Sequence, residues 1–107
     1  MIARIWHGRV PLEKAAEYER YVFDTGIRAY RATPGNLGAW LLRRNEDDVA
    51  HFTTLSFWES IHAIITFAGP DYEVARYFPR DDDYLLEREP KVVHYDVVGP
   101  HPSAGDT

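Results

Sequence analysis

Three histidines fall on segments that the sequence predicts as strands, and they are the side chains best suited to proton chemistry. They are His7, His51 and His94. A histidine titrates near neutral pH, so His7 or His94 could serve as an acid, a base or a hydrogen-bond donor. The alternative is a partly exposed strand histidine without a chemical role. The sequence alone leaves both interpretations open.

A metal site would require these histidines to converge. No H-x-H or H-E-x-x-H spacing is present. The ferredoxin-like fold predicted below has the strand order 4-1-3-2. In that order the end of the first strand would lie near the starts of strands three and four, so the histidines could meet. The other interpretation is three unrelated surface histidines. Asp81-Asp82-Asp83 lacks the spacing and the glycine of a calcium loop, which favours a solvated turn. We predict no metal and no cofactor.

The composition excludes several classes of function. A net charge of −5, from 12 Lys and Arg against 17 Asp and Glu, argues against a nucleic acid partner, which a basic surface normally binds. The absence of cysteine excludes disulfides, thiolate catalysis and cysteine-held clusters. No nucleophile elbow, phosphate loop or dinucleotide-binding glycine pattern is present.

The sequence also predicts where the protein resides. The first ten residues, MIARIWHGRV, are too short an apolar stretch, and too interrupted by charge, for a signal peptide. No apolar run reaches membrane-spanning length. We therefore expect a cytoplasmic protein with no membrane partner.

Hydrophobic periodicity predicts four strands and two helical regions. Strands are expected over 2–10, 37–44, 49–58 and 91–98. The first helix should follow Pro11 and end near Thr33, before a Pro-Gly-Asn turn. Its predicted apolar face consists of Leu12, Ala16, Phe23, Ile27 and Tyr30.

The second helical region is predicted in two pieces. Ile61, Ile64, Ile65 and Ala68 form an apolar stripe that Gly69-Pro70 should end. Asp71 could then cap a second piece that carries Val74, Ala75 and Phe78. The folded domain should span 1–98, followed by a flexible tail over 99–107.

The order β-α-β-β-α-β predicts a ferredoxin-like α+β fold, with a four-stranded antiparallel sheet and both helices on one face. The strands are too aromatic and aliphatic for the other face to stay fully wet. A bare apolar face implies a partner. The economical solution is a twofold homodimer whose sheets pack face to face as a dimeric α+β barrel.

Several short motifs occur in this framework. One is Trp58-Glu59-Ser60 at a strand-to-helix junction, and His94-Tyr95 fits the closing strand. A stretch of the second half adds Phe67-Ala68-Gly69, Tyr77-Phe78-Pro79, Asp82 and Tyr84-Leu85. Over roughly the first 98 residues, the chain resembles the antibiotic biosynthesis monooxygenase-like family of the dimeric α+β barrel superfamily.

That resemblance implies roles for particular residues. In relatives, a tryptophan at the position of Trp58 lines the pocket, although a core aromatic at a strand end is the alternative. Haem-degrading relatives carry an asparagine near the place of His7. They hold haem with a histidine late in the second helix, where this chain has Glu73-Val74-Ala75-Arg76-Tyr77. The resemblance therefore does not imply haem here.

Two functional hypotheses remain. The first is a cofactor-independent monooxygenase acting on a small aromatic molecule, for which a dry pocket, a base and hydrogen-bond donors suffice. His7, Trp58 and His94 are its catalytic candidates, and the ligand-binding candidates are Trp40, Phe52 and Tyr77. The second is a non-catalytic dimeric module of the same fold that binds a small ligand or merely assembles.

Overall fold

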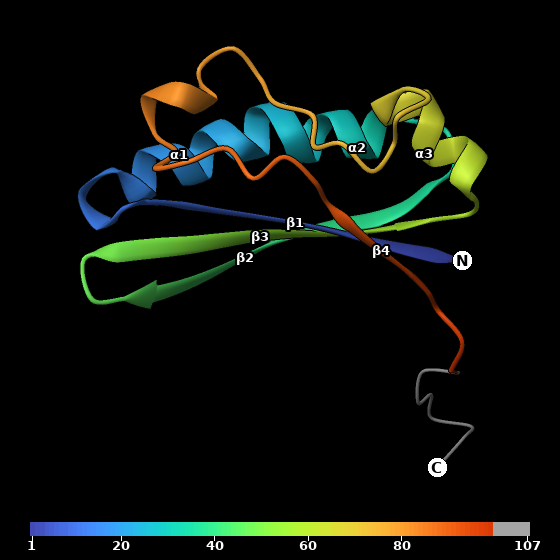
Figure 1. Cartoon of the computed structure of the whole chain (residues 1–107), viewed down its shortest axis with the longest axis horizontal. Helices are drawn as coiled ribbons and strands as arrows, with labels where there is room; N and C mark the ends of the chain where they lie inside the picture. The colour runs from blue at the N-terminus through green and yellow to red at the C-terminus, as the bar shows by residue number, and fades with distance from the viewer. Residues whose placement is uncertain (100–107) are drawn as a thin grey trace.

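The computed structural model describes residues 1–99 and shows a helical layer on one face of a four-stranded sheet (Figure 1). The strands are β1 (Ile2–Pro11), β2 (Asn36–Glu46), β3 (Val49–Trp58) and β4 (Val93–Asp96). They are antiparallel in the order β2-β3-β1-β4. This arrangement confirms the predicted fold class and strand order. The predicted tail beyond residue 99 lies outside the described residues.

A tight turn joins β2 to β3. The strands pair up to Glu46 and Val49, which leaves two residues for the loop. The first of them, Asp47, has a φ of 55°, in the left-handed region that two-residue hairpin turns require. Aspartate adopts this conformation more readily than most residues. The polar segment between the two predicted strands thus forms a hairpin.

The chain between β1 and β2 forms one helical rod that covers one face of the sheet. It begins with a 3-10 turn (η1, Leu12–Lys14) and continues as α1 (Ala15–Val22), a π turn (η2, Phe23–Ile27) and α2 (Arg28–Ala32). A π turn accommodates one extra residue within an α-helix and is frequent at functional sites. Gly26, which weakens the helical pattern of the sequence, lies in this turn.

The π turn changes which residues of the rod face the sheet. The buried set is Ala15, Tyr18, Val22, Ile27 and Tyr30. Of the residues that we predicted on the apolar face, Leu12 is 38% and Phe23 50% exposed, and Ala16 is exposed as well. A regular helix that buried residues 15, 18 and 22 would next bury 26 and 29. The extra residue of the π turn moves that face to 27 and 30. The predicted apolar face is therefore right for Ile27 and Tyr30 and wrong up to Phe23, where the turn begins.

The helix α3 (Ile61–Ala68) follows β3 directly. The Ser60 side chain caps it by accepting a hydrogen bond of 3.2 Å from the Ala63 backbone N–H. Gly69 ends it with a φ of 89°, a conformation that glycine adopts without strain. The first predicted piece of the second helical region is thus confirmed.

The second predicted helical piece is wrong. Residues 69–92 run along the helical layer with little regular structure, apart from a 3-10 turn (η3, Asp81–Asp83) (Figure 1). The Ala75 backbone N–H donates to the Pro90 carbonyl at 2.9 Å, and the Val92 N–H donates to the Glu73 carbonyl at 2.9 Å. Pairing between these two stretches therefore replaces the helical hydrogen bonds that periodicity predicted.

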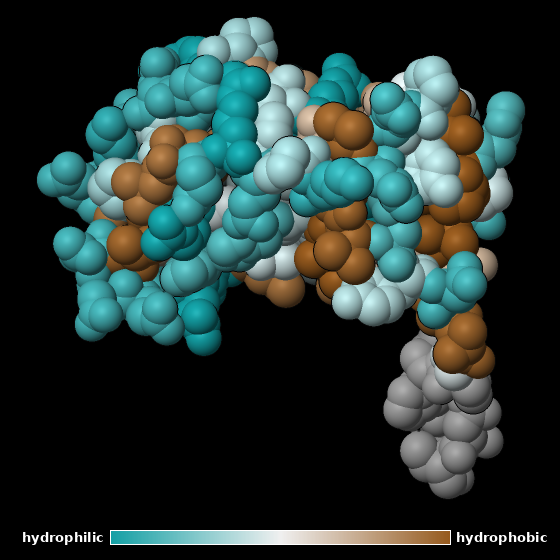
Figure 2. Space-filling view, viewed as in Figure 1, coloured by the Kyte–Doolittle hydropathy of each residue, from teal (hydrophilic) through white to brown (hydrophobic). Residues whose placement is uncertain are grey.

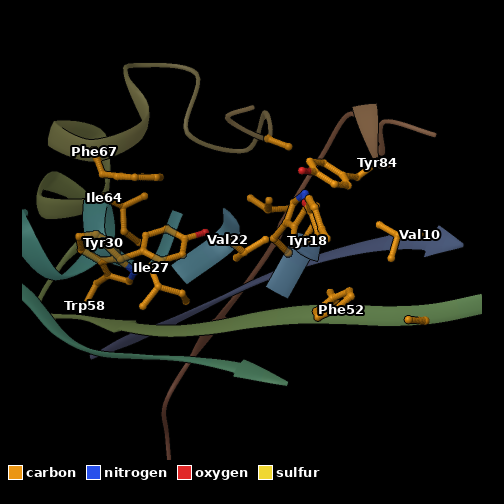
Figure 3. Packing of buried hydrophobic residues seen from close by; sticks show 14 of the residues in the cluster. Val10, Tyr18, Val22, Ile27, Tyr30, Phe52, Trp58, Ile64, Phe67 and Tyr84 are labelled. Atoms are coloured by element: carbon orange, nitrogen blue, oxygen red, sulfur yellow. The ribbon is translucent and has the colours of Figure 1, made fainter. Parts of the chain in front are cut away.

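The interior between the two layers is strongly aromatic. Figure 3 shows two groups of rings with Val22 between them. Tyr18, Phe52 and Tyr84 form one group, with centroids of Tyr18 lying 5.3 Å from each of the others. The other group consists of Tyr30, Trp58 and Phe67, with ring centroids 4.6–5.9 Å apart.

The opposite face of the sheet carries no helix (Figure 1). Apolar side chains on it are about half exposed, namely Trp40 at 52%, Leu42 at 48%, Val93 at 50% and Tyr95 at 57%. The side view in Figure 2 shows apolar surface concentrated on the half of the molecule near β4 and mostly polar surface around α1. We name the sheet face that carries no helix the open face. It is the partly apolar sheet surface that the sequence predicts.

No helix among residues 1–99 is both long enough and apolar enough to span a membrane.

Candidate functional site

A small cavity lies between the helical rod and the sheet. The rod, α3, strands β1 and β3, and the segment 76–81 all contribute to its wall. Its volume is about 30 Å³, which is room for one or two ordered water molecules. Its wall combines aromatic rings with hydroxyl, carboxyl and guanidinium groups.

A tyrosine and an aspartate form a hydrogen-bonded pair in this wall. The Tyr18 hydroxyl donates a hydrogen bond of 3.1 Å to Oδ1 of Asp81. The other oxygen, Oδ2, accepts a 2.6 Å hydrogen bond from the Phe78 backbone N–H. Both side chains are almost fully buried, at 1% and 5% exposure. We predicted a solvated Asp81-Asp82-Asp83 turn, and Asp81 departs from it by pointing into the protein.

Burial changes the acidity of both groups. It raises the pKa of the Asp81 carboxyl above its ordinary value, and the hydrogen bonds from Phe78 and Tyr18 only partly oppose this effect. Burial, and next the charge of Asp81, raise the pKa of the Tyr18 hydroxyl far above its ordinary value. Tyr18 therefore stays protonated as a donor, while Asp81 becomes a stronger base than an exposed aspartate.

A second polar pair contributes to the cavity wall from β1. The Trp6 indole N–H donates to the Tyr77 hydroxyl at 3.3 Å, and that hydroxyl donates to the Glu89 carbonyl at 2.5 Å. Burial raises the pKa of Tyr77, against the hydrogen bond from Trp6. These contacts fix Tyr77, one of the predicted ligand-binding residues, at the cavity wall.

The π turn supplies the part of the wall nearest the helix backbone. Thr25 and Gly26 both line the cavity. The nearest atoms to a Cβ added at Gly26 would be 3.8 Å away on Val22 and 4.0 Å away on Phe78. A Cβ at Gly26 would therefore meet only ordinary van der Waals contacts. The irregular turn places this glycine against the cavity.

An arginine covers the edge of the cavity. The exposed Arg76 guanidinium lies 4.8 Å from the centroid of the Phe67 ring and 5.0 Å from that of Phe78. Its Nη1 donates to the Phe67 carbonyl at 3.0 Å. Because this side chain is long and solvated, it can move away from the two rings more easily than the buried groups can.

Two of the predicted catalytic residues lie on the helix-covered side of the sheet, outside the cavity wall. Trp58 is fully buried and its indole N–H donates to the Ser56 hydroxyl at 2.9 Å. Its ring packs on Tyr30 and Phe67, as the core alternative for this residue requires. His94 lies on β4, beside Arg4 and with its ring 5.3 Å from that of Tyr72. Their catalytic roles stay predictions.

The third, His7, faces the open side of the sheet. Successive side chains of a strand point to opposite faces, and Trp6 points to the cavity, so His7 cannot. Its Nε2 lies 2.9 Å from Nδ1 of His51, and its Nδ1 contacts the Glu89 carboxylate. A surface hollow of about 320 Å³ adjoins this pair. The structure does not bring His7, Trp58 and His94 together, since each has different hydrogen-bonding partners.

The remaining ligand-binding candidates are also separated. Trp40 is on the open face, 52% exposed. Phe52 is a fully buried core residue behind Tyr18. His7 and His51 meet as the strand order allowed, but His94 lies on the other face. Within residues 1–99, no three His, Cys, Asp or Glu side chains gather in a way that could hold a metal ion.

The sequence analysis missed most residues of the cavity wall, among them Trp6, Tyr18 and Asp81. A signal for Trp6 was available, because a large aromatic residue on a strand is more often buried than its polar neighbour. For Tyr18, its spacing from Ala15 and Val22 was a signal. For Asp81 there was none, since three consecutive aspartates do not reveal which one is buried.

Comparison with known proteins places this geometry among solved folds. No protein-family model and no curated protein matches the sequence. Among solved structures, the heme-degrader MhuD from Mycobacterium tuberculosis, with two hemes bound in its active site, is similar with a TM-score of 0.63 and 21% identity. The match covers 95% of this chain and 100% of that one.

Two proposed antibiotic biosynthesis monooxygenases are also similar. The protein from Nitrosomonas europaea has a TM-score of 0.66 and 16% identity, covering 92% of this chain and all of that one. The protein from Caulobacter crescentus has a TM-score of 0.65 and 23% identity, covering 92% and 90%. At such identities the likeness establishes a shared fold. It confirms the fold that the resemblance implied.

Proposed function

We propose that this chain is a member of the antibiotic biosynthesis monooxygenase-like family and oxidises a small phenolic molecule with dioxygen, without a cofactor. The observation that carries the proposal is the buried Tyr18–Asp81 pair on the wall of the cavity. It offers a base of raised pKa beside a hydroxyl that remains a donor. The two similar solved structures described as antibiotic biosynthesis monooxygenases support the proposed reaction class.

In this reaction Asp81 takes the proton of the substrate hydroxyl, and the resulting phenolate reacts with dioxygen at a ring carbon that bears hydrogen. One oxygen atom becomes a new ring carbonyl and the other leaves as water, so a phenol and O₂ yield a quinone and H₂O. The substrate supplies all four electrons. The Tyr18 hydroxyl and the Trp6–Tyr77 pair hold the polar groups in place and keep bulk water out.

Haem, which MhuD binds, does not fit these residues. No histidine belongs to the wall of the cavity, and the Tyr77 hydroxyl is already engaged by Trp6 and Glu89. A volume of about 30 Å³ is also far below that of a porphyrin. No step of the proposed reaction therefore involves haem.

The small volume favours one alternative, a non-catalytic dimeric module of the same fold that merely assembles or binds a ligand only after rearrangement. An aromatic ring needs more room than one or two waters, so Arg76 and the segment 69–92 must shift before such a ligand enters. In either case we propose that the protein is a homodimer joined through the apolar open face.

Oxygen uptake separates the two functions. Wild-type protein and an Asp81→Asn variant are compared across a panel of phenols and quinols in an oxygen electrode. We expect uptake above the uncatalysed rate for at least one compound, and its loss in the variant. Binding of these compounds without any uptake would overturn the oxygenase in favour of the binding module.

A further inference from the structure

Arg4 is a buried cation that forms no ion pair with any residue among 1–99. It lies on β1 under the helical layer and is 1% exposed. Its Nη1 donates to the Tyr72 carbonyl at 2.6 Å and lies 3.0 Å from Nε2 of His94. Within residues 1–99, every ion pair involves other cations, and Nε of Arg4 is buried without any hydrogen-bond partner.

Such a group is costly to keep. Buried charges in proteins are normally paired, because a charge removed from water loses most of its solvation. The neutral partners of Arg4 satisfy individual N–H groups but do not neutralise the guanidinium. The unpaired Nε–H, which points at no acceptor, shows that even its hydrogen bonds are incomplete. An anionic group from outside the chain would satisfy both needs.

The position of Arg4 connects it to the cavity. Its guanidinium carbon lies 5.6 Å from the centroid of the Phe67 ring. Burial lowers the pKa of the guanidinium, and the nearby Tyr30 hydroxyl partly opposes that effect. Phe67 and Tyr30 both line the cavity. In Figure 3 these two rings lie at one end of the core and Tyr18 lies at the other. Arg4 is not itself part of the cavity wall and lies behind Phe67 and Tyr30, at the end remote from the Tyr18–Asp81 pair.

A second arginine contacts the same ring. Arg76 lies 4.8 Å from the Phe67 centroid at the exposed edge of the cavity. The chain as a whole carries a net charge of −5. Two guanidinium groups therefore form a local cationic region around Phe67 in an acidic protein. Neither group pairs with a carboxylate of residues 1–99. Such a region attracts an anion that the rest of the surface repels.

We propose that Arg4 binds a carboxylate of the substrate, so the substrate class is a phenol that also carries a carboxylate. This inference rests on the proposed function and specifies its substrate. The phenolic hydroxyl lies at the Tyr18–Asp81 end, and the carboxylate lies at the Arg4 end. A guanidinium whose Nε–H is free matches an oxygen of a planar carboxylate in both charge and geometry.

The test compares two ligands that differ only in charge. Binding of 3-hydroxyphenylacetate and of 3-hydroxyphenethyl alcohol to wild-type protein is measured by calorimetry. A charged hydrogen bond to Arg4 should make the acid bind about 10- to 100-fold more tightly. Equal binding of both would overturn the carboxylate receptor and leave the cavity as a phenol site. Failure of both to bind would overturn the proposed function, and this inference with it.

Variants then identify the arginine responsible. Arg4→Gln should remove the preference for the acid, whereas Arg4→Lys, which keeps the charge, should retain part of it. Arg43→Gln is the matched control, because Arg43 also lies over a ring, that of Phe52 at 5.8 Å, but on the edge strand. Thermal unfolding verifies that each variant is folded. Loss of the preference in Arg76→Gln, with none in Arg4→Gln or Arg4→Lys, would reject Arg4 as the receptor.

Discussion

The Tyr18 hydroxyl and the Asp81 carboxylate are joined by a 3.1 Å hydrogen bond across 63 positions of the chain. The bond connects the helical rod to the segment 69–92, which has few regular hydrogen bonds of its own. The Tyr18 ring also contacts Phe52 on the sheet. Tyr18 therefore contacts both the sheet and the segment 69–92, and it is also one member of the candidate catalytic pair.

Replacing Asp81 by asparagine should abolish oxygen uptake without lowering stability at neutral pH. The folded-state pKa of Asp81 is raised, so the stability it contributes is full below its ordinary value of 3.8 and is lost as pH rises through the folded pKa. At pH 7 the buried charge is thus a cost that asparagine avoids. Thermal unfolding of both proteins from acid to neutral pH measures this. A large loss of stability at pH 7 would contradict it.

Gly26→Ala should stabilise the fold and weaken ligand binding. Alanine restricts the unfolded chain and favours helix, which together are worth about 0.4–1 kcal/mol. Its Cβ meets only ordinary contacts, but it enters the cavity. Chemical denaturation and phenol titration provide the two measurements. Gly26→Leu extends the series and should block binding further. Undiminished binding in Gly26→Leu would show that ligands occupy another site.

His94 should make stability depend on pH. Burial, and then the charge of Arg4, lower the pKa of His94 below its ordinary 6.5. Its contribution is full above 6.5 and decreases as pH falls from 6.5 to the lowered value, because only the unfolded chain takes up the proton there. His94→Gln keeps an acceptor for Arg4 and removes the titration. Unfolding midpoints of both proteins should diverge below pH 6.5, and parallel curves would exclude this role.

Trp40→Glu should convert the proposed dimer into a monomer. Trp40 is on the open face and 52% exposed, and a charge there would oppose packing against a second sheet. Phe23→Glu is the matched control, since Phe23 is 50% exposed but lies on the helical rod. Light scattering after size exclusion gives the masses. A monomeric wild type, or equal effects of both variants, would count against the open face as the interface.

Haem should not bind stoichiometrically. The cavity wall presents no histidine, and Tyr77 is engaged in hydrogen bonds. Titration of the protein with haem, followed by absorbance, should give no saturable Soret band at one equivalent. Saturation at one equivalent would mean that residues 69–92 rearrange to expose a ligand.

The sequence predicted the elements better than the site. Strand alternation, the Pro-Gly-Asn turn and the apolar stripe that ends at Gly69-Pro70 are local signals, and they yielded the strands, the end of the first helix and α3. The piece over 71–78 failed because its backbone groups bond to residues 90–92, a distant pairing that periodicity does not report.

The site failed for a different reason. Histidine is the obvious candidate for proton chemistry, so His7 was favoured over its neighbour. Strand parity, however, places Trp6 in the cavity and His7 on the open face. Asp81 obtains its chemical character from burial, which depends on the tertiary packing of a turn. Composition gives the same weight to all three adjacent aspartates.

The π turn has a consequence for how such proteins can diverge. It amounts to one residue inserted into an otherwise regular helix, and Thr25 and Gly26 within it line the cavity. Deletion of a single codon in this turn would restore the α-helical register and rotate every later helical residue, Tyr30 included, by about 100°. One small genetic event therefore separates a chain with this hollow from a chain whose layers pack differently.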